Sequence, residues 1–171
     1  RTSMSHNEAG NYKDGDGNRV HSSFERRNQM LQLGFTPTEN TLLTGTYERS
    51  RGEAAYADRM MDGSKFDRDA WNVRFVQRNI TPWFTELELR YGQSKIDHVM
   101  DTYSMRYLSM MGNQVKKAMN PKRETNTGHL KATFDWLDIN LQTGIDYMRD
   151  KHLSRMEMNG EGYRHKPYQP Q

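Results

Sequence analysis

The stretch Thr85–Met100, TELELRYGQSKIDHVM, alternates between two kinds of side chain with a period of two. One set of alternate positions is apolar and holds Leu87, Leu89 and Tyr91. The other set is charged or small and holds Glu86, Glu88, Arg90, Gly92 and Ser94. Because successive side chains of an extended chain point to opposite faces, this stretch predicts a β-strand with one apolar face and one charged face.

The same alternation recurs in five other segments, so the sequence predicts about six strands. Their apolar positions are Leu31, Leu33 and Phe35; Leu43, Gly45 and Tyr47; Trp71, Val73 and Phe75; Leu130, Ala132, Phe134 and Trp136; and Ile139, Leu141, Ile145 and Tyr147. Strands of about ten residues with this pattern are typical of the wall of a transmembrane β-barrel. A half-buried sheet in a soluble β-sandwich would show the same alternation.

The segments between the predicted strands are sorted by length. Three are short: 36–40, 79–82 and the pair Leu137–Asp138. They alternate with three long polar segments, 50–65, 101–122 and 150–171. Outer-membrane β-barrels have short periplasmic turns on one side and long extracellular loops on the other, whereas a soluble meander has no reason to sort its loops in this way.

Aromatic residues fall where two interfacial girdles would lie. Three of them, Phe35, Trp83 and Trp136, lie beside the short turns, and three others, Tyr47, Tyr91 and Tyr147, lie toward the long loops. We therefore predict an all-β fold, an antiparallel transmembrane β-barrel segment with short periplasmic turns and long extracellular loops. Six strands cannot close such a barrel, so we expect residues 1–171 to be part of a barrel domain whose plug domain and remaining strands lie elsewhere.

Composition supports this class and argues against others. Only 33% of the residues are hydrophobic and 27% are charged, which is too polar for an ordinary soluble domain, but 18 aromatic residues argue against disorder. The net charge of +3 is too small to predict a nucleic-acid partner. There is no cysteine, no nucleophile-elbow serine and no histidine pair at metalloprotease spacing, so we do not expect an enzyme.

A candidate metal site lies at the long-loop end of the first stretch. His98 and Met100 are both even-numbered, so they share the charged face with Glu88, and residues two apart on a strand lie about 6.6 Å apart. A thioether is a soft ligand that favours Cu(I), and imidazole also suits copper. On spacing alone a His-x-Met pair is common, and a lumen-facing polar residue beside a gap-filling methionine is the more frequent explanation.

Methionines are frequent in the long polar segments, at Met60, Met61, Met105, Met110, Met111 and Met119. In a solvated loop they would have no core to fill, which favours a methionine-rich loop that captures a soft metal. The alternative is a short helix, in which Met105, Leu108, Val115 and Met119 would form a packing stripe.

Four segments together resemble the TonB-dependent copper receptors of Gram-negative outer membranes: 11–17 (NYKDGDG), 54–59 (AAYADR), 61–68 (MDGSKFDR) and 97–101 (DHVMD). The resemblance implies a barrel of about 22 strands, embedded in outer-membrane lipid, with a plug domain inside it. Such receptors import copper with energy that TonB delivers through the plug. The resemblance also implies that copper is held between a Cys and a Met of the plug and a His-x-Met of the barrel wall, which corresponds here to His98 and Met100.

Two other functions fit the same fold. A TonB-dependent receptor for a siderophore or another metal chelate would use His98 and Met100 only to line its lumen. A passive porin or an adhesin would have no plug and no TonB-contacting segment. A plug that carries Cys and Met at close spacing would favour the copper receptor over both.

Overall fold

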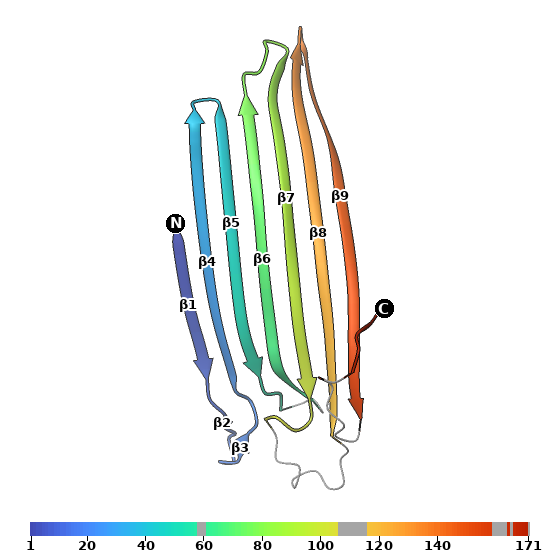
Figure 1. Cartoon of the computed structure of the whole chain (residues 1–171). Helices are drawn as coiled ribbons and strands as arrows, with labels where there is room; N and C mark the ends of the chain where they lie inside the picture. Colours follow the sequence, from blue (N-terminus) through green and yellow to red (C-terminus); the bar gives the residue numbers. More distant parts are fainter. Residues whose placement is uncertain (58–60, 106–115, 159–163, 165, 171) are drawn as a thin grey trace.

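The computed structural model describes residues 1–57, 61–105, 116–158, 164 and 166–170. One antiparallel sheet has the strand order β1-β4-β5-β6-β7-β8-β9-β10, and β2 and β3 form a separate small hairpin (Figure 1). From β4 to β9 each strand pairs with the next one along the chain. The sheet is therefore an up-and-down meander, the topology from which outer-membrane barrel walls are built.

Six long strands account for most of the sheet. They are β4 (Phe24–Thr38), β5 (Thr41–Ala54), β6 (Asp62–Arg78), β7 (Phe84–Asp101), β8 (Lys117–Trp136) and β9 (Ile139–Met158). Each contains one of the six segments predicted from period-two alternation, so the predicted fold class, an all-β antiparallel barrel segment, is confirmed.

The sequence pattern missed the shorter strands. These are β1 (Thr2–Ala9), β2 (Tyr12–Lys13), β3 (Arg19–Val20) and β10 (Gln169–Pro170). Strand β1 pairs with β4 along its whole length although its sequence, TSMSHNEA, has no apolar face. Backbone pairing alone holds such a strand, and backbone pairing leaves no signal in hydrophobic periodicity.

The turns and loops lie at opposite ends of the sheet (Figure 1). At one end are the short turns that follow β4, β6 and β8, and at the other end, which we call the long-loop end, are the long connections. The predicted loops 50–65, 101–122 and 150–171 are wrong in extent, because β5 continues to Ala54, β6 begins at Asp62, β8 begins at Lys117 and β9 continues to Met158. Strand pairing satisfies backbone hydrogen bonds whatever the side chains are, so it continues beyond the apolar stretch.

The apolar face carries an exposed belt of large side chains. Its members include Leu33 (64% exposed), Phe35 (62%), Leu141 (54%), Ile145 (69%) and Tyr147 (53%). The register aligns them across the sheet, for example Tyr47 with Trp71 and Leu89 with Leu130. We call this the belt face and the opposite one the polar face. A continuous apolar surface of this kind requires an apolar environment, which lipid provides.

Buried residues gather near the long-loop end, and most are polar. Among the described residues, Asp62, Asp101 and Asn120 are at most 2% exposed, as are Val99 and Ala118.

No helix among the described residues is long and apolar enough to cross a membrane.

Candidate functional site

His98 lies near the end of β7 on the polar face. Its Nε2 atom is buried and has no hydrogen-bond partner among the described residues. Buried polar atoms of native proteins almost always have a partner, because an unpaired one costs about 1–3 kcal/mol. A buried imidazole nitrogen without a partner, two residues from a methionine (Met100), is a feature expected of a metal-binding histidine.

Phe66 holds the His98 ring in place. The two residues are register partners on β6 and β7, and their ring centroids lie 4.2 Å apart at an interplanar angle of 36°. A β-bulge at Ser64, between Gly63 and Lys65, shifts the pairing on the loop side of Phe66, so that Gly63 lies opposite Met100. Bulges are frequent beside functional sites. The imidazole is therefore packed against an aromatic face and its rotation is restricted.

Gly63 makes room for this arrangement. A Cβ atom at position 63 would lie 1.9 Å from one ring carbon of Phe66 and 2.2 Å from another, so only glycine fits beneath the ring in this conformation. This contact gives a physical reason for the sequence MDGSKFDR, in which Gly63 and Phe66 occur together. Sequence reasoning did not assign Phe66 to the site, because only the register between β6 and β7 places it opposite His98.

The surroundings of His98 disfavour the protonated form of its imidazole. Burial lowers the pKa of the imidazole, and the charge of Asp97 acts in the opposite sense without compensating for burial. His98 lies beyond the belt, on the long-loop side of Tyr91. A histidine with a lowered pKa has an unprotonated nitrogen at neutral pH, and only that form binds a metal ion.

Methionines continue across the polar face from Met100. The register pairs Met100 with Met119 on β8, and Met119 with Met156 on β9. Met119 and Met156 are 38% and 52% exposed. The prediction that Met119 lies in a loop is wrong, as is its place in a helical stripe, because β8 begins at Lys117. Sequence reasoning did not identify Met156, because only strand pairing brings it beside the others.

The other methionines of the predicted methionine-rich loops are not part of the strands that the structure describes. Met61 and Met105 lie outside the strands, and Met60, Met110 and Met111 lie outside the described residues. No group of three or more His, Cys, Asp or Glu side chains that could hold a metal ion occurs in the described part of the chain.

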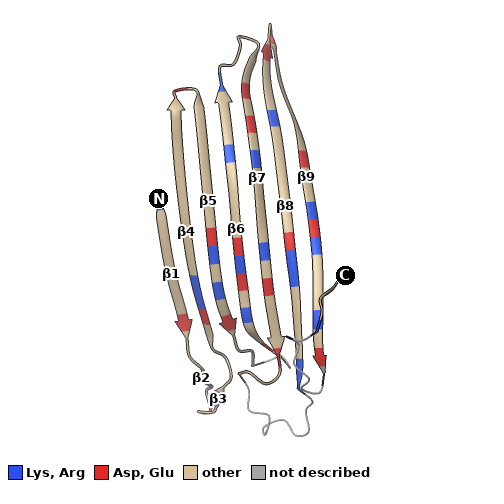
Figure 2. Ribbon diagram, viewed as in Figure 1, with Lys and Arg blue, Asp and Glu red and all other residues tan. Residues whose placement is uncertain are grey.

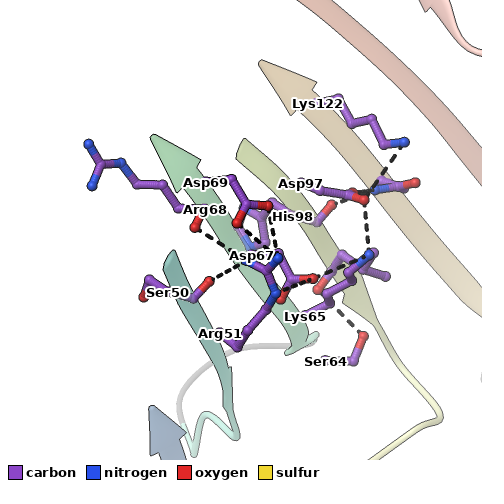
Figure 3. Close-up of polar contacts among 12 residues, drawn as sticks. Ser50, Arg51, Ser64, Lys65, Asp67, Arg68, Asp69, Asp97, His98 and Lys122 are labelled. Atoms are coloured by element: carbon purple, nitrogen blue, oxygen red, sulfur yellow. Dashed lines mark hydrogen bonds and ion pairs between the residues drawn. The ribbon is translucent and has the colours of Figure 1, made fainter. Parts of the chain in front are cut away.

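The belt face at the same level carries a network of opposite charges, which we call the belt-face network: Arg51, Lys65, Asp67, Asp69, Asp97 and Lys122 (Figure 3). Asp97 accepts hydrogen bonds from Lys65 Nζ at 2.9 Å and from Asn120 Nδ2 at 2.6 Å. Burial disfavours its ionisation, but these bonds and the lysine charges outweigh burial and lower the pKa of Asp97. The Asp97 carboxylate is therefore already paired within the fold.

Other polar-face charges are paired among themselves. Glu88 accepts hydrogen bonds from Arg74 Nε, at 2.9 Å, and from Arg90 Nε. His129 contacts Asp146. These groups line the polar face, and nothing in their geometry orients them for acid–base chemistry.

Comparison with solved structures adds an independent observation. The structure matches 28 solved chains, one of which is titled "Copper transporter OprC". That similarity has a TM-score of 0.86 and 32% sequence identity over 99% of this chain. The chain spans 28% of the length of that protein. No protein-family model and no curated protein matches the sequence.

Proposed function

We propose that this chain is part of the wall of an outer-membrane receptor that binds and imports copper, and that His98 and Met100 are copper ligands. The observation that carries the proposal is the buried, unpartnered Nε2 of His98 beside Met100. The similarity to a copper transporter at 32% identity supports the same substrate.

The chemistry is binding and gated passage, without covalent change. His98 supplies a neutral imidazole nitrogen and Met100 a thioether, a combination that selects Cu(I) over harder divalent ions. Two ligands are too few for tight binding. We therefore propose that a Cys and a Met of a plug domain complete the site, and that TonB acts on that plug to release the ion.

Phe66 and the other methionines have supporting roles in this proposal. The Phe66 ring fixes the imidazole orientation and excludes water from one side of it. Met119 and Met156 place two more thioethers in line with Met100 on the same face. An ion that leaves one soft ligand therefore meets another on the neighbouring strand.

The test is Cu(I) affinity of the purified full-length receptor, measured against a competing chelator, with zinc as a second ion. We expect His98→Ala and Met100→Ala each to weaken Cu(I) binding by about 100-fold or more, since loss of even an outer-shell partner costs roughly 10–100-fold. Matched controls are His129→Ala and Met148→Ala, which remove the same side chains from the polar face at a distance from the site.

The outcomes separate the functions. Loss of copper binding in the two site variants, with both controls unchanged, supports the copper receptor. Copper binding that is unchanged in all four variants rejects His98 and Met100 as ligands and leaves a receptor for another chelate as the better explanation.

A further inference from the structure

The belt face changes character sharply toward the long-loop end. Its apolar belt ends near Trp71, Tyr91 and Tyr147, and charged residues follow on β5 to β9 between the belt and the long-loop end (Figure 2). This boundary is where lipid chains would give way to lipid headgroups. The charges immediately beyond it therefore face the headgroup layer.

The cations just beyond the apolar belt include two groups. Arg51, Lys65 and Lys122 each contact a carboxylate of the belt-face network. In contrast, Lys95, Arg149 and Lys151 are exposed, and within the described residues they make no ion pair. The first group is structural, and the second is available to a ligand.

The register gathers the available cations in one place. Lys95 pairs with Glu124, which pairs in turn with Lys151, so the two lysines flank one carboxylate. Two strand spacings put the Lys95 and Lys151 backbones about 10 Å apart, and Arg149 lies about 7 Å from Lys151 along β9. Side chains of this length can converge on a single group.

Charge and shape indicate the kind of ligand. The group contains three cations, Lys95, Arg149 and Lys151, and one carboxylate, that of Glu124, so its net charge is +2. The Glu124 carboxylate also accepts a hydrogen bond from Gln93 Nε2 at 2.9 Å. A phosphomonoester carries a charge of about −1.5 to −2 at neutral pH. An open cleft of about 360 Å³ provides the space: Lys95, Glu124 and Lys151 line it together with the belt-face network, and Arg149 lies outside its lining.

We propose that Lys95, Arg149 and Lys151 bind the phosphorylated headgroup of a lipid in the leaflet nearest the long loops. The charge complementarity and the position just beyond the aromatic edge of the belt carry this inference. It requires that the belt face lies in a membrane, but it does not depend on copper binding. Each such cation near an anionic lipid surface contributes roughly fivefold in affinity.

The experiment compares two lipids bound by the delipidated full-length receptor in neutral detergent. The probes are phosphatidic acid and phosphatidylcholine with identical acyl chains, and the readout is the ratio of their affinities. We expect the double variant Lys95→Gln, Lys151→Gln to reduce the preference for phosphatidic acid by about tenfold or more. The matched control, Lys117→Gln with Lys131→Gln, removes the same charge from the polar face and should keep the preference.

Three results would overturn the proposal. The double variant could retain the full preference, or the polar-face control could lose as much, which would indicate a general charge effect. Inorganic phosphate could displace the lipid headgroup, which would indicate a site for a soluble ligand. Copper affinity of the same samples is measured in parallel and should be unchanged, so failure here is distinct from failure of the copper assignment.

Discussion

Asp97 and His98 are adjacent in sequence but face opposite sides of β7, and their surroundings differ in kind. Asp97 is held by Lys65, Asn120 and Lys122, whereas the Nε2 atom of His98 is buried without a partner. A polar group whose partners are all supplied by the fold stabilises the fold. A buried polar group that the fold leaves unpaired costs stability, and this cost is accepted where a ligand supplies the missing partner.

The largest difference should appear when His98 and Asp97 are each replaced by asparagine. His98→Asn should weaken Cu(I) binding by the full receptor about 100-fold, because an amide is a poor ligand for a soft ion. Asp97→Asn should change Cu(I) affinity by less than about threefold, because this side chain faces away from the site. Equal losses in the two variants would show that the faces are not functionally distinct.

The next largest effect should come from the ring that holds the imidazole. Phe66→Leu keeps an apolar side chain but removes the flat surface, and we expect Cu(I) affinity to fall about tenfold through a less ordered His98. X-ray absorption should show weaker imidazole coordination in this variant, a change that simple destabilisation would not produce. Phe66→Tyr should restore most of the affinity, and Phe75→Leu on the belt face is the matched control.

A smaller effect should follow from Met119, the second of the three methionines, Met100, Met119 and Met156, that lie opposite one another on β7, β8 and β9. Met119→Leu keeps the volume but removes the sulfur, and we expect copper uptake by cells to slow about threefold while equilibrium affinity at His98 and Met100 hardly changes. Met148→Leu, on the same face of β9, should leave uptake at the wild-type rate. A normal uptake rate in the Met119 variant would confine the site to His98 and Met100.

The smallest effect belongs to the belt-face network. Arg51 donates hydrogen bonds to both oxygens of Asp69, at 3.0 and 2.8 Å, and these bonds are the main reason that the pKa of Asp69 is lowered below 3.8. Because the pair is partly exposed, Asp69→Asn should destabilise the receptor by only about 0.5 kcal/mol at pH 7. A group with a lowered folded pKa stabilises above its unfolded value and loses that contribution as the pH falls through the folded value. The unfolding temperatures of the wild type and of Asp69→Asn should therefore converge as the pH falls below 3.8. A difference that stays constant with pH would show that ionised Asp69 is not its cause.

Much of the fold could be predicted from the sequence. The alternation in 85–100 and in five other segments predicted the six long strands, and the parity of His98 and Met100 predicted their face. These predictions succeed because side-chain direction in a strand has a fixed period of two. They failed at Met119 and at the strand ends, where hydrogen-bonded pairing continues through polar residues that carry no apolar alternation.

Only the tertiary structure decided which side chains meet across strands. The sequence by itself determined the six long strands, the order of short and long connections between them, and the face of the side chains within their alternating segments, since all of these are local properties of an extended chain. The pairing of Phe66 with His98, the row from Met100 to Met156 and the flanking of Glu124 by Lys95 and Lys151 depend on register. Register arises from backbone hydrogen bonds between distant segments, and it cannot be read from the periodicity of a single strand.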